Sequence, residues 1–267
     1  MRSTTGAGYD GGMGTEGVHG TATAFSEAAD VYEQARPGYP PEVLAWLGEH
    51  AGIGPGVRVL DLAAGTGKLT RGLVALRAAV VAVEPVAGMR RALAAAVAGT
   101  PVVAGVAQAI PLGTGTVDAC TVAQAFHWFA TESAVAELHR VLRPGGALAV
   151  VWNRRELSDP LQADLQRLMA PLRGDAPSLE SGLWRAALEG PGGGACFTPG
   201  AHFTVDWRQP IDVDGVADRV ASVSFVASLA EPERAGILEQ ARAAARSRPA
   251  PLALPYTAEV TCYRRRD

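Results

Sequence analysis

Two carboxylates in the first half of the chain each belong to a short run of β-branched and small apolar residues. Asp61 lies near the end of residues 57–62, and Glu84 directly follows residues 80–83. Such runs are typical of buried strands in a parallel sheet, whose carboxyl ends meet at one edge. A carboxylate at that edge can bind a cationic amine or accept hydrogen bonds from the hydroxyls of a ribose.

A small-residue turn follows the first carboxylate. Ala63, Ala64, Gly65, Thr66 and Gly67 separate it from a helical pattern that starts at residue 69. Glycine accepts positive φ and lets a ligand approach the backbone, and a helix N-terminus offers unpaired N–H groups. The stretch therefore predicts a strand, a tight turn and a helix start with a ligand bound between them.

The ligand class is narrowed by what the turn lacks. A dinucleotide fingerprint asks for glycine or alanine where Thr70 stands, and a phosphate-binding P-loop asks for glycine at Leu62. The acidic strand end fits a cationic or hydroxyl-bearing ligand better than a pyrophosphate. The spacing of the two carboxylates suits NAD and S-adenosylmethionine (SAM) alike, so both remain open on this evidence.

A second chemically competent stretch is Gln-Ala-Phe-His-Trp-Phe at residues 124–129, after a strand predicted over residues 116–122. His127 could take a proton from an acceptor hydroxyl or amine, because histidine titrates near neutrality. It could equally shape the pocket through a hydrogen bond to a backbone carbonyl. Trp128 is either an aromatic wall that attracts a cationic group of a ligand or a core residue.

Composition excludes several classes of protein. The net charge is −3, which leaves no electrostatic footprint for nucleic acid. The three cysteines lack C-x-x-C spacing and the five histidines lack a ligand pattern, so we expect reduced thiols and no metal site. We find neither an apolar run long enough to cross a membrane nor a signal-peptide core, and we expect a cytoplasmic protein.

The elements that must position these residues predict one α/β fold. We expect a doubly wound, seven-stranded, mostly parallel sheet with an antiparallel C-terminal hairpin. The domain boundaries predicted are a disordered tail at residues 1–23, a ligand-binding core with an N-terminal lid helix at 24–154, a helical substrate cap at 155–200, and a completion of the sheet at 201–267.

Residues 25–154 resemble the class I SAM-dependent methyltransferases, closest to the small-molecule branch that includes the quinone-biosynthesis and trans-aconitate methyltransferases. The likeness rests on the glycine turn, on Gln124-x-x-His127-Trp128, on Leu142-x-Pro-Gly-Gly before a buried strand, and on Tyr32-x-x-x-Arg36-Pro-x-Tyr-Pro. Ala63 replaces the first glycine of the family turn, and we expect it to keep a negative φ.

The resemblance implies specific roles. SAM is the implied cofactor, and S-adenosylhomocysteine (SAH) the implied product. The residues implied to bind the cofactor are Tyr32, Arg36, Asp61, Ala63, Ala64, Gly65, Thr66, Gly67, Glu84, Pro85, Met89, Gln108, Ala109, Ile110, Gln124 and His127. The acceptor would contact Tyr32, His127, Trp128 and Trp152, and His127 is the candidate catalytic residue.

The predicted function is methyl transfer to O, N or C of a small-molecule metabolite, with a natural-product intermediate as one option. A SAM-binding protein of the same fold without methyl transfer, such as a cyclase or a regulator, is the main alternative, because fold does not fix function. A nucleotide-linked oxidoreductase is a weaker one. The sequence does not indicate the oligomeric state.

Overall fold

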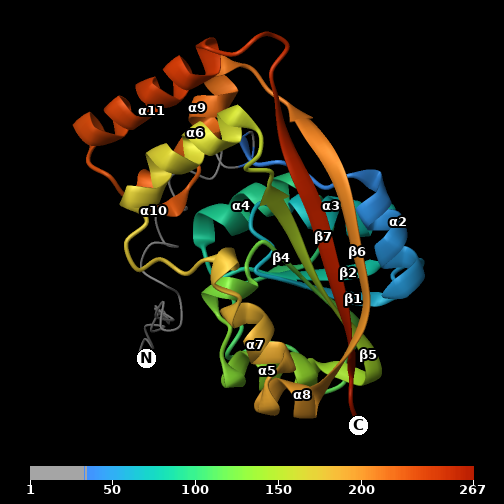
Figure 1. Ribbon diagram of the computed structural model, residues 1–267. Coiled ribbons are helices and arrows are strands. Elements are labelled where there is room, and N and C mark those ends of the chain that lie inside the picture. Colours follow the sequence, from blue (N-terminus) through green and yellow to red (C-terminus); the bar gives the residue numbers. More distant parts are fainter. Residues whose placement is uncertain (1–32, 34) are drawn as a thin grey trace, which may run out of the picture.

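The chain is described by a computed structural model that covers residue 33 and residues 35–267. The predicted tail at residues 1–23, most of the lid helix and Tyr32 lie outside the described residues. Within the described part, a single seven-stranded sheet runs through the molecule (Figure 1).

The strands follow the predicted class of fold. Their order across the sheet is β3-β2-β1-β4-β5-β7-β6. Strands β1 to β5 pair in parallel, whereas β7 pairs antiparallel with both β5 and β6. The bounds are β1 Arg58–Leu62, β2 Ala79–Val83, β3 Val102–Val103, β4 Val117–Ala123, β5 Leu142–Arg155, β6 Phe197–Pro210 and β7 Ala253–Arg265.

Strand β1 has β2 on one side and β4 on the other, so the strand order reverses at this point. In open α/β sheets the crevice outside the carboxyl ends of two such strands is where ligands bind. Asp61 on β1, Glu84 after β2 and the segment after β4 are therefore brought to one crevice, as their positions in the sequence predicted.

Helices cover both faces of the sheet because its strands alternate between two apolar cores. Leu60, Val122 and Val150 face helices α5 (Glu132–Val141) and α7 (Leu183–Glu189). Val59 and Val151 face α2 (Pro41–His50) and α3 (Lys68–Ala75). Helix α4 (Ala87–Ala96) connects β2 to β3, and α8 (Pro191–Cys196) follows α7.

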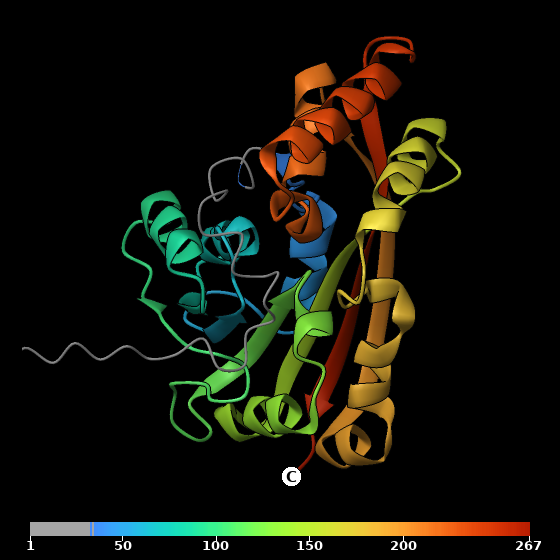
Figure 2. The same ribbon diagram turned by 90° about the vertical axis from the view of Figure 1, so that its left-hand side faces the viewer.

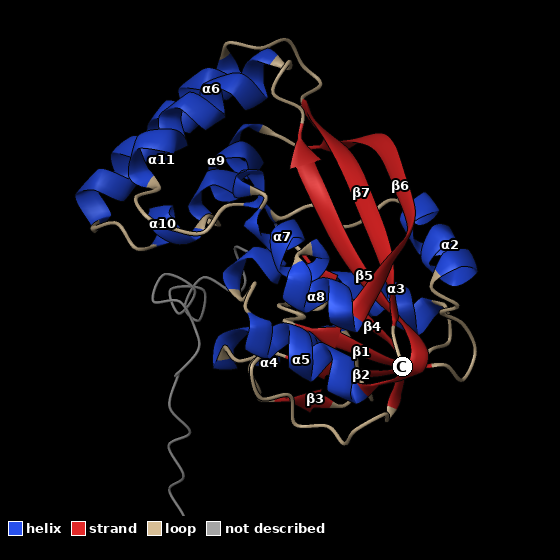
Figure 3. Ribbon diagram, turned by 60° about the horizontal axis from the view of Figure 1, so that its bottom comes forward, coloured by secondary structure: helices blue, strands red, loops and turns tan. Residues whose placement is uncertain are grey.

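A third apolar cluster lies beyond the carboxyl end of β5 and builds a cap. It joins Leu161 and Leu165 of α6 (Pro160–Met169), Val216 of α9 (Val213–Ala221) and Ala241 of α11 (Glu231–Arg246), with the short α10 (Ser224–Ala227) at its side. Figures 1 and 3 show these helices gathered at one end of the sheet, away from α5, α7 and α8.

This arrangement corrects the predicted cap boundaries. The cap is assembled from α6 and from α9–α11, which come from either side of β6, while α7 and α8 pack beside α5 on a face of the sheet. The side view shows the two groups of helices apart (Figure 2). The predicted C-terminal hairpin is correct in its pairing, but the three cap helices connect its two strands. No described helix is long and apolar enough to cross a bilayer.

Candidate active site

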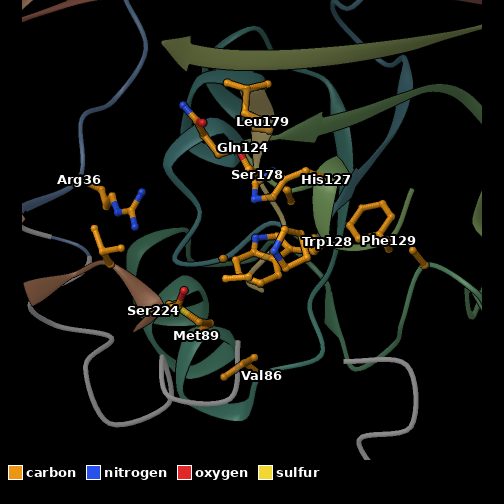
Figure 4. A pocket seen from close by; sticks show the side chains of 18 of the residues that line it. Arg36, Val86, Met89, Gln124, His127, Trp128, Phe129, Ser178, Leu179 and Ser224 are labelled. Atoms are coloured by element: carbon orange, nitrogen blue, oxygen red, sulfur yellow. The ribbon is translucent and has the colours of Figure 1, made fainter. Parts of the chain in front are cut away.

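A cavity of about 250 Å³ opens at the carboxyl ends of the parallel strands, beneath the cap. A smaller cavity of about 70 Å³ adjoins it and reaches Asp61, Thr66 and Lys68. Both cavities touch Ala63, Gly65, Gln124 and Asn153, so the glycine turn and the exit of β4 form the partition between them. Figure 4 shows Arg36, Gln124, His127 and Trp128 around one hollow, with Met89 and Ser224 along its rim.

The glycine turn departs from the predicted backbone at one residue. Ala63 has a φ of 54°, in the left-handed region, so the expectation of a negative φ was wrong. Gly65 at 58° and Gly67 at 86° are left-handed as well. An L-residue with a side chain in this region costs about 1–2 kcal/mol relative to glycine, and such strain is frequent where a backbone is held for a ligand.

Glu84 holds this turn against the second strand. Its carboxylate accepts hydrogen bonds from the backbone N–H of Gly65 at 2.9 Å and of Val86 at 2.8 Å. Burial raises its pKa, although the two backbone donors oppose this shift. Each carboxylate oxygen keeps a lone pair, and the side chain lines the larger cavity, so it can still accept from ligand hydroxyls.

Asp61 lies under the smaller cavity and is 1% exposed. Thr70 Oγ1 and Thr121 Oγ1 donate hydrogen bonds to its two oxygens at 2.6 and 2.8 Å. Burial raises the pKa of Asp61 to about 6 despite these hydrogen bonds. A cationic group bound in the smaller cavity would favour the ionised form, so the site is suited to an ammonium group.

The segment predicted to meet an adenine ring is only partly in the site. Gln108 lines the larger cavity, and its buried Oε1 has no hydrogen-bond partner among the described residues. Ala109 and Ile110 do not line it, which corrects two predicted contacts. The side chain of Ile110 is buried in the core, and its N–H donates to the Glu137 carboxylate at 2.8 Å.

His127 lies on a short 3-10 helix, Phe126–Trp128, after the exit of β4. Its ring is tilted against Trp128 and Trp152, with centroids 5.0 and 5.5 Å apart, and its buried Nδ1 has no partner among the described residues. Burial lowers its pKa to about 4, with Glu180 opposing and Arg36 and Arg173 adding to the shift. The imidazole is neutral at neutral pH and a weak base, which favours a pocket-shaping role over proton abstraction.

Trp152 does not line either cavity, so its predicted contact with an acceptor is wrong. It is fully buried and lies on the face of β5 that packs on the core, between His127 and Trp184. Its ring supports His127 from behind. The next residue, Asn153, points to the opposite face and lines both cavities, where its Oδ1 accepts from Trp207 Nε1 at 3.1 Å.

Of the remaining predicted residues, Gly67 lines neither cavity and caps α3 instead, and Tyr32 is outside the described part. The predicted residues that line one or both cavities are Arg36, Asp61, Ala63, Ala64, Gly65, Thr66, Glu84, Pro85, Met89, Gln108, Gln124, His127 and Trp128.

The sequence did not identify the residues that the cap region and its neighbours contribute. Met169, Arg173, Leu179, Arg219 and Phe225 all line the larger cavity. They come from five separate segments with no shared motif. Only the tertiary contacts of the cap bring them together, so no local pattern could have found them.

Comparison with known proteins agrees with this architecture. Residues 60–150 match the family model described as a methyltransferase domain. An uncharacterized methyltransferase of Mycobacterium tuberculosis is 38% identical over 238 residues, covering 87% of this chain and 92% of the relative. A demethylmenaquinone methyltransferase of Mycobacterium bovis is 42% identical over 112 residues, covering 42% of this chain and 45% of that protein.

Solved structures show the same fold. A candidate type II methyltransferase from Anaeromyxobacter dehalogenans superposes with a TM-score of 0.56 at 27% identity, covering 86% of this chain and 97% of that structure. The fold and the relatives together define the class: the chain belongs to the methyltransferase family and has its Rossmann-like fold. It is an enzyme of the SAM-dependent class, and the predicted resemblance is confirmed.

Proposed function

We propose that this enzyme transfers a methyl group from SAM to an O, N or C atom of a small molecule. The observation that carries the proposal is the pair of adjoining cavities at the strand-order switch, with a buried carboxylate at each. Asp61 suits an ammonium group, and Glu84 suits vicinal hydroxyls. A ligand with both features, joined by a chain that crosses the glycine turn, fits the two cavities together.

Two unpartnered polar atoms support the fit. Thr66 Oγ1 in the smaller cavity and Gln108 Oε1 in the larger one are buried without hydrogen-bond partners among the described residues. A buried polar atom left in this state is costly, so a ligand that reaches both is favoured. Thr66 would meet the amino-acid end of SAM, and Gln108 would accept a hydrogen bond from the adenine amino group.

When bound, SAM supplies an electrophilic methyl group on a sulfonium. The chain's residues need only hold the acceptor in line with that group and exclude water, and positioning alone contributes several kcal/mol. Trp128 would offer its ring to the sulfonium, and His127, packed on Trp152, would help to fix the direction from which the acceptor approaches. A nucleophile that reaches the site already deprotonated needs no base. His127, whose pKa burial lowers to about 4, is disfavoured as the group that takes a proton from a neutral acceptor, so that proton would pass to solvent.

Calorimetric titration with SAM, SAH, NADH and NADPH tests the cofactor. Binding of the first pair alone supports the proposal, while binding of a nicotinamide nucleotide alone contradicts it. The alternative, a SAM-binding protein without methyl transfer, is tested with methyl-labelled SAM and a metabolite extract. Label that enters the low-molecular-weight fraction supports transfer, and SAM binding without any labelled product favours the alternative.

A further inference from the structure

The larger cavity is unusually rich in arginine. Arg36, Arg154, Arg155, Arg173 and Arg219 line it, against two carboxylates, Glu84 and Glu180. Two of these arginines interact with other residues of the protein. Arg154 is exposed and paired with Glu259 at 3.2 Å, and Arg36 donates to the side chain and carbonyl of Ser222.

The other three arginines, Arg155, Arg173 and Arg219, have a single ion pair among them within the described part of the chain. Arg173 lies 3.4 Å from Glu180, whereas neither Arg155 nor Arg219 forms an ion pair within the described part of the chain. Arg155 donates one hydrogen bond, to Gln166 Oε1 at 2.6 Å. Arg219 donates from Nε to the Tyr256 hydroxyl at 3.2 Å, and its buried Nη1 has no partner among residues 35–267.

These arginines come from separate elements, so their grouping is a property of the fold. Arg155 ends β5, Arg173 follows the 3-10 helix Ala170–Leu172, and Arg219 lies on α9 in the cap. Bringing like charges together away from water is unfavourable. Burial and then the charge of Arg219 lower the pKa of Arg155 to about 10, with Arg173 contributing as well. An anion bound among them would relieve this repulsion.

Two arginines of this cluster lie outside the cavity that the proposed function assigns to the carboxylate of SAM. Arg155 and Arg173 line only the larger cavity, whereas Arg36 and Arg219 line both. The amino-acid end of SAM is placed by the proposed function in the smaller cavity, so Arg155 and Arg173 remain for a different anion. The walls beside them are apolar: Trp128, Phe129, Met169, Leu179 and Phe225.

We propose that the methyl acceptor is an amphipathic carboxylic acid, whose carboxylate binds Arg155 and Arg173 with help from Arg219 and whose apolar body lies against Trp128 and Phe225. The inference rests on the proposed function, because it assigns the acceptor of the same site. A guanidinium presents paired N–H donors that match the two oxygens of a carboxylate, and such bidentate pairs are stronger than neutral hydrogen bonds. Arg173 already meets one carboxylate, that of Glu180, through a single contact at 3.4 Å.

The test uses the SAH-saturated protein and matched probes. Octanoate, phenylacetate and benzoate are titrated beside their amides and beside inorganic phosphate, with thermal shift and calorimetry as readouts. We expect at least one carboxylate to bind while its amide does not. Arg155→Gln and Arg173→Gln should each weaken that binding at least tenfold, and Arg155→Lys less. Arg167→Gln, at a solvent-facing arginine of α6, removes the same charge and should leave binding unchanged.

Each other outcome contradicts the proposal in a distinct way. Equal binding of acids and amides, or no binding of any carboxylate, overturns the anionic acceptor. Binding of phosphate alone overturns the carboxylate. Loss of SAH affinity in both Arg155→Gln and Arg173→Gln would assign the arginines to the cofactor instead. Failure of the wild-type protein to bind SAH would contradict the proposed function itself, before any acceptor probe is added.

Discussion

At the scale of single residues, Ala63 is one of three described residues other than glycine with a left-handed conformation, together with Arg77 and Gln124. Replacing Ala63 by glycine removes a strain of about 1–2 kcal/mol from the folded state. The greater conformational freedom of glycine stabilises the unfolded chain by about 0.5–1 kcal/mol and so offsets part of this gain. We expect Ala63→Gly to raise the free energy of unfolding by roughly 0.5–1 kcal/mol in denaturant titration. Ala64→Gly, at the neighbouring position without positive φ, should lower it, and the same sign for both variants would contradict the strain.

The raised pKa of Asp61 predicts that the free energy of unfolding depends on pH. Its pKa is raised to about 6 in the folded state from 3.8, so the folded protein binds the extra proton between about pH 4 and 6. The stability that this proton supports is present below pH 4 and lost as the pH rises through 6. Asp61→Asn should therefore match the wild type near pH 4 and exceed it by up to about 3 kcal/mol above pH 6.

The same variant should bind SAH more weakly, because the ammonium group loses its anionic partner. Urea titrations across pH 4 to 8, with calorimetry at pH 7.5, measure both effects. If Asp61→Asn is less stable than the wild type at pH 8, the buried charge of Asp61 does not destabilise the folded protein, and the prediction is contradicted. Unchanged SAH affinity would remove Asp61 from the site.

The pKa of His127 makes stability depend on pH in the opposite direction. Its pKa is lowered to about 4 from 6.5, so its neutral form is favoured in the folded state. The unfolded chain binds more protons between those values, and stability from this residue is complete above pH 6.5 and lost as the pH falls toward 4. His127→Gln should flatten this part of the curve of unfolding free energy against pH. An unchanged slope in the His127→Gln protein would contradict this assignment.

At the scale of elements, α5 braces the segment that holds Gln108. Glu137 on α5 accepts from the Ile110 N–H and from Arg140, which in turn donates to the carbonyls of Ile110 and Leu112. Glu137→Ala leaves the Ile110 N–H without its acceptor and should cost about 1–3 kcal/mol of stability, with a loss of SAH affinity. Glu132→Ala, in the exposed first turn of the same helix, is the matched control. Equal losses in both variants would contradict the bracing role.

Local patterns predicted the elements that carry the proposed cofactor site. The β-branched runs gave β1, β2 and β4, and the glycine turn with its following helix placed Asp61 and Glu84 at one crevice. The conformation of Ala63 was beyond such patterns, because the turn is also held by tertiary hydrogen bonds, from the Ala64 N–H to the Val83 carbonyl and from the Gly65 N–H to the Glu84 carboxylate. The side chain of Trp152 was predicted on the wrong face of β5. The alternation of residues along a strand separates two faces, but it does not indicate which face meets the cavity.

At the scale of the whole molecule, the cap covers the larger cavity and contributes part of its lining. Its helices are joined by an apolar cluster that includes Leu165, Val216 and Ala241, and it brings Arg173 and Arg219 over the crevice. The sequence did predict cap helices, but it could not pair α6 with α9 and α11. Strand β6 separates α6 from α9 and α11 in the sequence. The apolar face of an amphipathic helix does not indicate which other helix it packs against. The acceptor side of the site was unpredictable for the same reason.

The central claim is that SAM spans both cavities with its ribose on Glu84, and calorimetry of SAH with Glu84→Ala tests it most directly. We expect the affinity to fall by about a hundredfold, since two hydrogen bonds to a charged group are lost. Glu84→Gln should lose less, and Glu49→Ala, at a glutamate whose side chain is 79% exposed, should bind as the wild type does. An unchanged affinity in a folded Glu84→Ala protein would contradict the account.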